Sequence, residues 1–534
     1  MSTFRRFFQF AIAAIFLFAG CKSINSNNET IALVEIPAII PAPSEANWAT
    51  GQFIIPEVNV ICYNPGAKTS AGWLQHLLES AKINSSLNSG EACGNWNISL
   101  DGSMEELGEE GYILNITSEG VSLKSGTEAG LFYGIQTLRQ MLPAGLENAS
   151  SQKAIALRNV EIKDSPKYSW RGSMVDMARS FFGIDYLKRH VDRMALYKLN
   201  RLHLHLTDDQ GWRIEIKAKP KLTEIGGKSS VTGGNSGFIT QAEYMELQEY
   251  ALARNIVVIP EVDMPGHVYA ALVSYPELNC EENSNIEPKK AIPPQLYSGY
   301  EVGWSRFCLE DESTYDFVSE VVEELAKITK GPWIHLGGDE IEDPRYEEFV
   351  VKADSIVRHH GKISIGWEEV TKAAVDESLI SQNWNGKTES IVDVQIIESI
   401  CSSFYLDHAN YPGQPDAKNN WCKPDGVSIK NVYDFKTNNP MVLGVEAPVW
   451  TEHVLNDSMM DDRFWPRLVA VAEVGWSKEE NRNFDDFTNR LQKHETRLRN
   501  MGIRFHPSPE VPWATKSKVI MDPKNVYADF ELKN

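Results

Sequence analysis

The stretch Trp333-Ile334-His335-Leu336-Gly337-Gly338-Asp339-Glu340 decides both the fold and the candidate site. Its first four residues are large, and several are β-branched or aromatic, which is typical of a buried strand. Two glycines then allow the strand to end in an unusual turn and the backbone to approach a ligand closely. Side chains alternate between the two faces of a strand. Asp339 and Glu340, which are adjacent, can therefore point into the same site only where the strand has ended.

Strand-like runs alternate with helical patterns from Trp170 onward, which is typical of βα units and a parallel sheet. Eight such strands predict an α/β chain with a (β/α)8 TIM barrel over residues 166–505. The expected strands are 173–177, 201–207, 256–261, 333–336, 362–367, 379–384, 400–406 and 441–448. The clearest expected helices are 185–199, 241–254, 315–330, 346–360 and 484–501.

Residues 36–165 predict a smaller, separate α/β (α+β) domain in front of the barrel. Residues 112–116 and 120–123 have the pattern of a hairpin, and 127–142 has the apolar spacing of a helix that ends before Pro143. No cluster of catalytic residue types occurs before Trp170, so this domain is expected to brace the barrel. Residues 506–534 are expected to form a C-terminal tail.

The N-terminus has the features of an export signal over residues 1–20. Arg5 and Arg6 precede an apolar run that is short for a membrane span. Phe18-Ala19-Gly20-Cys21 resembles a bacterial lipobox, in which the cysteine carries lipid, although an ordinary signal peptide with a chance cysteine is the alternative. We expect a protein lipid-anchored at Cys21 to the bacterial cell envelope, at the outer membrane or a periplasmic face, with residues 21–35 as tether.

The other cysteines are Cys62, Cys93, Cys280, Cys308, Cys401 and Cys422. An even number in an exported chain permits three disulfides with fifteen possible pairings. Their spacing favours pairs between neighbours along the chain, but the sequence alone leaves the pairing of Cys62, Cys93, Cys401 and Cys422 open. No Cys-x-x-Cys occurs, so a zinc ribbon is unsupported.

The chain has 534 residues and a formal net charge of −21, which argues against nucleic acid or an anionic polymer as partner. Fourteen tryptophans suit a carbohydrate site, although large cores also hold indoles. Barrel sites lie at the C-terminal ends of the strands, and nearly every expected strand here ends in polar or aromatic residues. They are Asp176, Arg179, His203, His205, Asp208, Glu261, Asp263, His267, Asp339, Glu340, Trp367, Trp384, Tyr405, Asp407, Trp450 and Glu452.

The block Trp-x-His-x-Gly-Gly-Asp-Glu resembles the catalytic motif of the β-N-acetylhexosaminidases of glycoside hydrolase family 20. Residues 130–138 also resemble the end of the non-catalytic domain that precedes family 20 barrels, so the resemblance runs from about 127 to 502. It implies an exo-acting retaining glycosidase, without a cofactor, that releases terminal β-linked GlcNAc or GalNAc from oligosaccharides or glycoconjugates. Linkage, the choice between the two sugars and the oligomeric state stay open.

The resemblance also implies the role of each site residue. Glu340 would be the general acid/base, Asp339 would orient the 2-acetamido group, and Tyr405 would donate to the acetamido oxygen. Sugar hydroxyls would be held by Arg179, Asp407 and Glu452; the walls would be Trp367, Trp384 and Trp450; Asp208 and His267 would link to the acid; and Trp421 would lie at the +1 side. The family analogy further favours a Cys280–Cys308 disulfide.

Ordinary retaining glycosidases use two carboxyl groups about 5 Å apart on opposite sides of the scissile bond. Neighbours in sequence such as Asp339 and Glu340 are poorly placed for that. Family 20 is instead substrate-assisted: the acetamido oxygen attacks the anomeric carbon and forms an oxazolinium ion. Asp339 then needs only to accept the amide N–H and to stabilise the positive charge.

Two other classes compete with this interpretation. His203 and His205 share one strand face, as in metal-dependent TIM-barrel hydrolases. Such barrels need further ligands and an Asp on the last strand, which here reads Glu446-Ala447-Pro448-Val449-Trp450. We therefore predict no metal site and expect hydrogen-bonded barrel histidines. A non-catalytic glycan-binding barrel would be expected to lose the acid or its partners, and these are present.

Overall fold

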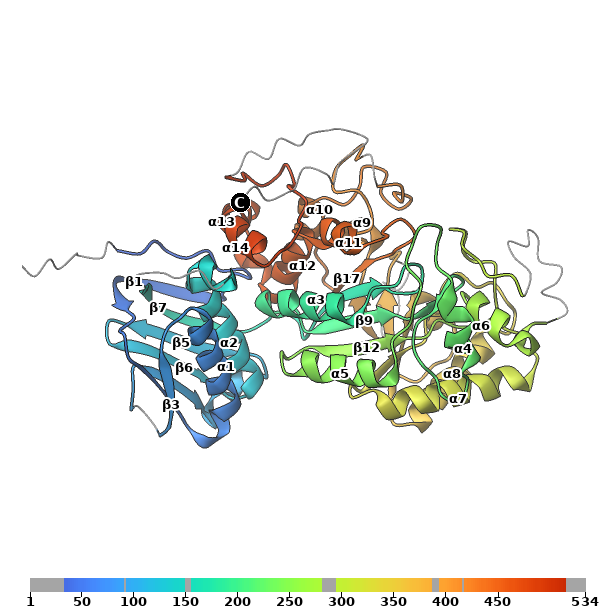
Figure 1. Ribbon diagram of the computed structural model, residues 1–534, viewed down its shortest axis with the longest axis horizontal. Coiled ribbons are helices and arrows are strands. Elements are labelled where there is room, and N and C mark those ends of the chain that lie inside the picture. Colours follow the sequence, from blue (N-terminus) through green and yellow to red (C-terminus); the bar gives the residue numbers. More distant parts are fainter. Residues whose placement is uncertain are drawn as a thin grey trace, which may run out of the picture.

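The computed structural model describes residues 33–90, 93–148, 155–280, 294–386, 393–414 and 417–514. The expected signal peptide, Cys21 and most of the expected tail lie outside these residues. The chain forms two domains, a sheet domain (blue) and a larger barrel (Figure 1). Among the described residues, no helix is both long and apolar enough to cross a bilayer.

The N-terminal domain is a seven-stranded sheet in the order β1-β7-β5-β6-β4-β2-β3. Helices α1 (Lys68–Ser80) and α2 (Glu128–Met141) pack side by side against it. The predicted hairpin is the antiparallel pair β5–β6, and Thr127 caps α2 by accepting from the Gly130 N–H. The strands are β1 Glu45–Ile54, β2 Asn59–Tyr63, β3 Ser85–Ser89, β4 Trp96–Leu100, β5 Tyr112–Thr117, β6 Gly120–Ser125 and β7 Ala156–Asp164.

The second domain is a closed barrel in which every neighbouring pair of strands is parallel, which confirms the predicted fold class. A short ribbon, β10 (Thr207–Asp208) with β11 (Gly211–Trp212), follows the second barrel strand. The barrel strands are β8 Trp170–Asp176, β9 Arg201–His205, β12 Val257–Glu261, β13 Trp333–His335, β14 Ile363–Trp367, β15 Ile380–Asn383, β16 Gln395–Glu398 and β17 Val442–Val449.

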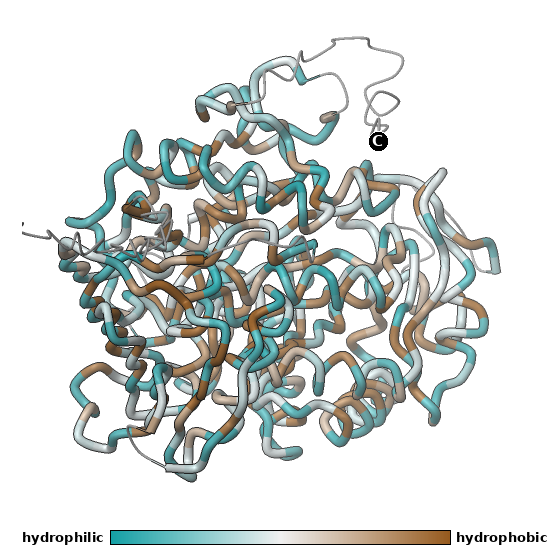
Figure 2. The backbone as a smooth tube through the Cα atoms, turned by 60° about the vertical axis from the view of Figure 1, so that its left-hand side comes forward, coloured by the Kyte–Doolittle hydropathy of each residue, from teal (hydrophilic) through white to brown (hydrophobic). Residues whose placement is uncertain are grey.

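Helices surround the barrel, and Figure 2 shows hydrophilic and hydrophobic residues alternating along them, as amphipathic helices require. Val318, Val321, Val322 and Leu325 form the buried stripe of α7. The helices are α3 Ile184–Leu196, α4 Lys221–Glu224, α5 Gln241–Leu252, α6 Tyr269–Ser274, α7 Glu312–Ile328, α8 Tyr346–His359, α9 Cys401–Phe404, α10 Ile429–Tyr433, α11 Asp457–Phe464, α12 Arg467–Trp476, α13 Phe484–Lys493 and α14 Glu495–Asn500.

The predicted seventh strand at 400–406 is wrong, because β16 lies earlier, at Gln395–Glu398. Ile396 and Ile397 are adjacent and both buried, as in a parallel strand covered on both faces. The later run instead begins with the short helix α9, in which Cys401 and Phe404 are buried at helical spacing. The predicted helix 484–501 is also divided, into α13 and α14 at His494, whose ring bonds the Tyr197 hydroxyl and the Ala38 carbonyl.

Three disulfides join Cys62–Cys93, Cys280–Cys308 and Cys401–Cys422. This confirms the pairing that the spacing favours. The first lies in the N-terminal domain, and each of the other two lies within the segment that joins two consecutive barrel strands.

Buried ion pairs join the two domains. Arg171 in β8 contacts Glu110 at 2.8 Å, and Lys198 contacts Asp164 at 3.0 Å. Arg497 in α14 contacts Glu147 at 2.5 Å. Because a buried charge is costly without its partner, the barrel depends on carboxylates that the N-terminal domain supplies. This arrangement supports the bracing role expected from the sequence.

Candidate active site

The ends of β8 and β17 are tied together by Asp176. Its Oδ2 accepts from the Thr451 backbone N–H at 2.9 Å and from the Thr451 hydroxyl at 3.0 Å. Its Oδ1 accepts from the backbone N–H groups of Ala178 and Arg179 at 2.8 and 3.1 Å. Asp176 thereby fixes the turn from which Arg179 extends.

Arg179 is buried at the barrel mouth and pairs with Asp208, Nη2 to Oδ2, at 2.6 Å. Its guanidinium lies over the Trp450 ring, 4.9 Å from the centroid. Burial opposes its charge, but Asp208 and Asp176 raise the pKa of Arg179 well above its ordinary value. Its Nε has no hydrogen-bond partner among the described residues, so one buried donor is available to a ligand.

His267 lies between Asp208 and the two motif carboxylates. Its Nδ1 is 3.5 Å from Oδ1 of Asp208. Its Nε2 is 3.7 Å from Oδ2 of Asp339 and 3.6 Å from Oε2 of Glu340. Burial opposes protonation, but Asp208 and Asp339 raise the pKa of His267 well above its ordinary value. The structure thus brings together the predicted acid/base Glu340, the predicted orienting carboxylate Asp339, and the Asp208–His267 pair expected to link to the acid.

The two glycines of the motif make the turn that the sequence predicts. Gly337 has φ +68°, Gly338 has φ +99° and Glu340 itself has φ +57°. A Cβ on Gly337 would lie 1.8 Å from Oδ1 of Asp263, so no larger residue can stand there. The same Asp263 oxygen accepts the Gly338 N–H at 3.0 Å. This turn is what directs Asp339 and Glu340 toward the same histidine.

Burial distinguishes the two carboxylates. The Asp339 side chain is 16% exposed, whereas that of Glu340 is 37% exposed. Burial raises the pKa of Asp339 to about 7, with His267 opposing the shift and Glu340 adding to it. Oδ1 of Asp339 is buried without a donor in the described part of the chain, so it can accept from a ligand. Glu340 therefore lies nearer the solvent than Asp339 does.

Aromatic rings line the mouth beside these carboxylates. Trp450 lies 5.7 Å from Trp367 and 6.1 Å from Tyr405, centroid to centroid. Trp384 and Tyr405 both contact Trp421, which is 55% exposed and therefore lies at the rim. Burial, with the nearby charges of Asp339 and Asp407, raises the pKa of Tyr405 well above its ordinary value, so its hydroxyl stays a donor.

Two further carboxylates carry unused acceptors. Oδ1 of Asp407 and Oε2 of Glu452 are buried without a donor among the described residues. Burial raises the pKa of Glu452 to about 7, against the charge of Arg179. With the unused donor of Arg179, these oxygens suit the hydroxyls of a sugar. All twelve predicted site residues therefore lie in one connected cluster, with Trp421 at its edge.

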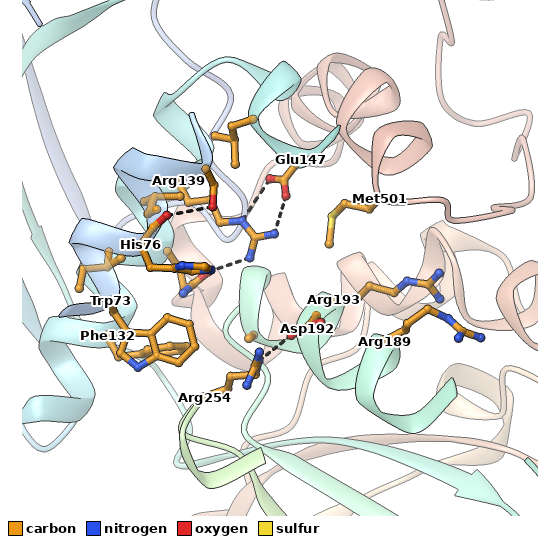
Figure 3. Close-up of a pocket in the computed structure, with 16 residues that line it drawn as sticks. Trp73, His76, Phe132, Arg139, Glu147, Arg189, Asp192, Arg193, Arg254 and Met501 are labelled. Carbon is orange, nitrogen blue, oxygen red and sulfur yellow. Dashed lines mark hydrogen bonds and ion pairs between the residues drawn. The ribbon is translucent and has the colours of Figure 1, made fainter. Parts of the chain in front are cut away.

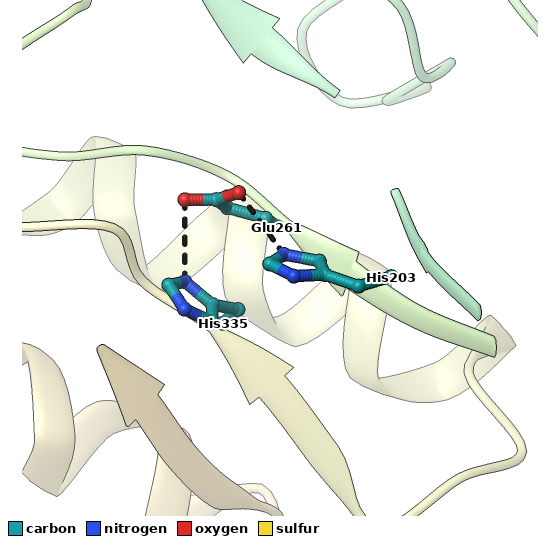
Figure 4. A group of neighbouring side chains, drawn as sticks. All are labelled: His203, Glu261 and His335. Carbon is teal, nitrogen blue, oxygen red and sulfur yellow. Dashed lines mark ion pairs between the residues drawn. The ribbon is translucent and has the colours of Figure 1, made fainter. Parts of the chain in front are cut away.

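His203, Glu261 and His335 meet inside the barrel below this mouth (Figure 4). Nδ1 of His203 bonds Oε1 of Glu446 at 2.8 Å, and its Nε2 lies 3.0 Å from Oε2 of Glu261. His205 bonds Glu261 and Asp208. Both strand histidines are thus hydrogen-bonded barrel residues, as expected. That the protein needs no metal stays a prediction.

The sequence pattern predicts no role for Glu261, Asp263 or Glu369. Glu369 accepts from the Trp384 indole at 3.1 Å, and Asp263 supports the glycine turn. A signal exists for Glu261, since a charged residue ends the otherwise apolar strand Val257–Glu261.

A cavity of about 350 Å³ lies elsewhere, between the two domains (Figure 3). Trp73 and Phe132 line one side, and Arg254 and Met501 lie across from them. It contains none of the predicted site residues. Its cations are paired, Arg139 with Glu147 at 2.5 Å and Arg254 with Asp192 at 2.5 Å. We therefore interpret this cavity as a gap at the interface between the two domains rather than as the active site.

Family models match most of the chain. The model described as "Glycosyl hydrolase family 20, catalytic domain" matches residues 168–348 and 344–479. The model described as "Glycosyl hydrolase family 20, domain 2" matches residues 36–165.

Known proteins resemble the chain along most of its length. A β-hexosaminidase of Porphyromonas gingivalis is 33% identical over 527 residues, covering 89% of this chain and 65% of that protein. A β-N-acetylhexosaminidase of Cellulomonas fimi is 34% identical over 423 residues, covering 76% of this chain and 82% of that protein. A solved N-acetyl-β-hexosaminidase of Streptomyces plicatus superposes with a TM-score of 0.82 at 35% identity, covering 90% of this chain and 99% of that one.

Proposed function

Since this chain belongs to glycosyl hydrolase family 20 and is a β-N-acetylhexosaminidase, we propose that it removes terminal, non-reducing β-linked GlcNAc or GalNAc by the residues assembled at the barrel mouth. The observation that carries this proposal is the position of His267, with Asp339 and Glu340 both within 4 Å of its Nε2. Only one of these two carboxylates is largely buried, so the two suit different tasks.

The first step uses the substrate's own nucleophile. The acetamido group lies among Trp367, Trp384 and Trp450, its N–H donates to Asp339, and Tyr405 donates to its oxygen. That oxygen bonds to the anomeric carbon while the bond from this carbon to the aglycone oxygen breaks. Glu340 gives its proton to the departing oxygen, and an oxazolinium ion remains.

The second step reverses these roles. Glu340, now a carboxylate, takes a proton from water, whose oxygen bonds to the anomeric carbon while the ring of the oxazolinium opens. The sugar leaves with its β configuration retained. Throughout, Asp339 balances the positive charge in a site that largely excludes water, where such stabilisation is strong.

The remaining residues position the sugar. Arg179, Asp407 and Glu452 hold its hydroxyls through the unused donor and acceptors described above. These groups suit either configuration at O4, so both GlcNAc and GalNAc are accepted. Trp421 stacks on the sugar at the +1 side, consistent with its exposure at the rim.

The assay that tests this function is release of nitrophenol from the β-GlcNAc, β-GalNAc and β-glucose aryl glycosides, with and without EDTA. We expect both N-acetyl sugars to be cleaved, the glucoside to be almost inert, and EDTA to have no effect. Activity that collapses with EDTA and returns with zinc would support a metal-dependent hydrolase. A chain that binds the glycosides without cleaving any would be a glycan-binding protein.

The protein is exported and held at the bacterial cell envelope by lipid on Cys21, in this proposal. The lipobox-like Phe18-Ala19-Gly20-Cys21 supports it, because a cysteine that carries more than one acyl chain can hold a protein stably at a bilayer. Cell fractionation tests it: the wild type should partition with membranes, and Cys21→Ala should be released or left unprocessed. Wild type found wholly in the soluble fraction would contradict the anchor.

A further inference from the structure

Glu261 ends β12 below the site and is fully buried. Its Oε1 accepts from the Trp367 indole N–H at 2.9 Å. Its Oε2 bonds Nδ1 of His205 at 2.6 Å and lies 3.0 Å from Nε2 of His203. The two oxygens of one carboxylate therefore bind different parts of the site.

The two oxygens of Glu261 start two branches of contacts, one to the acetamido pocket and one to the Asp208–His267 pair. Trp367 belongs to the wall around the acetamido group. His205 continues through its Nε2 to Oδ2 of Asp208 at 3.0 Å, and Asp208 contacts both Arg179 and His267. Since both ring nitrogens of His205 face carboxylates, burial is outweighed and the pKa of His205 is raised well above its ordinary value.

We propose that Glu261 is a positioning residue that fixes the Trp367 indole and the His205 ring together, and so couples the acetamido pocket to the Asp208–His267 pair. It holds these groups without touching the sugar. A buried charge with strong donors on both oxygens holds its partners within a small angular range. This inference rests on the proposed roles of Trp367 and Asp208.

Glu261→Gln is the informative variant because an amide has only one acceptor oxygen. With His205 protonated on both ring nitrogens, the amide oxygen can accept from the Trp367 indole or from Nδ1 of His205, but not from both. Misplacement of catalytic groups by about 1 Å can cost on the order of 10²-fold in rate. We expect a loss of that order in kcat/KM for both nitrophenyl and disaccharide substrates, and weaker inhibition by a thiazoline mimic of the bicyclic intermediate.

Glu446 offers a matched control. It is equally buried in the barrel and also bonds an indole and a histidine, Trp170 and His203, but it contacts neither Trp367 nor His205. Glu446→Gln should lower the thermal midpoint comparably while leaving thiazoline inhibition near the wild-type value. An equal loss of inhibition in both variants would assign Glu261 to stability alone and overturn the proposal.

A double-mutant cycle tests the coupling itself. Because one of the two branches from Glu261 acts through His205 and Asp208, the kcat/KM losses of Glu261→Gln and Asp208→Asn should be non-additive. His205→Gln breaks the same chain at its middle member, so it should reproduce the part of the effect that passes through Asp208 even if Glu261→Gln fails to fold. Additive losses, or wild-type kinetics for Glu261→Gln, would refute the inference while the wild type still cleaves β-GlcNAc glycosides. If the wild type is inactive, the proposed function itself fails.

Discussion

Nε2 of His267 lies 3.6 Å from Oε2 of Glu340, and the two residues share an unusual backbone conformation. His267 has φ +56° and Glu340 has φ +57°, in the left-handed region that non-glycine residues rarely adopt. Such positions cost on the order of 1–3 kcal/mol each and persist where the surroundings enforce them. Here they place an acid and its partner at one mouth.

Glu340→Gln tests the general acid. The variant cannot protonate a leaving group, so kcat/KM for a disaccharide should fall by about 10²–10⁴-fold. Nitrophenyl glycosides scarcely need that proton and should lose much less. Steady-state kinetics on both substrates measure the difference, and Glu342→Gln, an exposed carboxylate two residues on, should leave both rates unchanged. Equal losses on the two substrates would contradict the role of Glu340 as acid.

Asp339→Asn tests the orienting carboxylate. Its charge is needed whatever the leaving group, so both substrates should lose on the order of 10²–10³-fold. Tyr405→Phe should follow the same pattern more mildly. A variant that keeps its rate on nitrophenyl glycosides would show that Asp339 does not stabilise the oxazolinium ion.

The pKa of Asp339 also predicts a pH dependence. Burial raises that pKa to about 7, and only the ionised form can both accept the amide N–H and balance the positive charge of the oxazolinium ion. The wild-type kcat/KM should therefore fall as pH drops through this pKa. Bound substrate stabilises the charged form, so the acid limb of kcat should lie at lower pH. The residual activity of Asp339→Asn should lack this limb, and an unchanged profile would contradict the assignment.

The interdomain ion pairs predict a stability effect. Glu110→Gln leaves the buried Arg171 without its counter-charge, which should cost about 3–5 kcal/mol. Glu106 is the control, because its pair with Lys163 is exposed and exposed pairs contribute about 0–1 kcal/mol. Thermal or urea unfolding measures both variants. A Glu110→Gln protein as stable as Glu106→Gln would show that the N-terminal domain does not brace the barrel in this way.

Much of the fold follows from local pattern. Apolar runs alternating with helices predict the barrel, and Gly337-Gly338 predicts the turn that directs Asp339 and Glu340. The seventh strand was the exception, because Gln395–Glu398 is short and its buried neighbours Ile396 and Ile397 lack an alternating pattern. The run 400–406 is richer in large residues, so its pattern predicts a strand. In the structure this run begins with helix α9 instead.

The supporting residues are harder to predict than the site. Tyr405 and Trp450 can be assigned because the motif and strand order carry them. Glu261 and Glu369 act by holding indoles on other segments of the chain, 106 residues away for the bond between Glu261 and Trp367 and 15 residues away for that between Glu369 and Trp384. Such partners are set by tertiary packing, which no local pattern encodes.

In the proposed mechanism the substrate's acetamido oxygen is the nucleophile. The most direct test is kcat/KM for nitrophenyl glycosides whose acetyl methyl carries none, one, two or three fluorines, since each fluorine weakens that oxygen as a nucleophile. If the acetamido oxygen is the nucleophile, kcat/KM should fall steeply and monotonically along the series. A flat series, together with a covalent sugar ester found by mass spectrometry on Asp339 after treatment with a 2-fluoro glycoside, would contradict it.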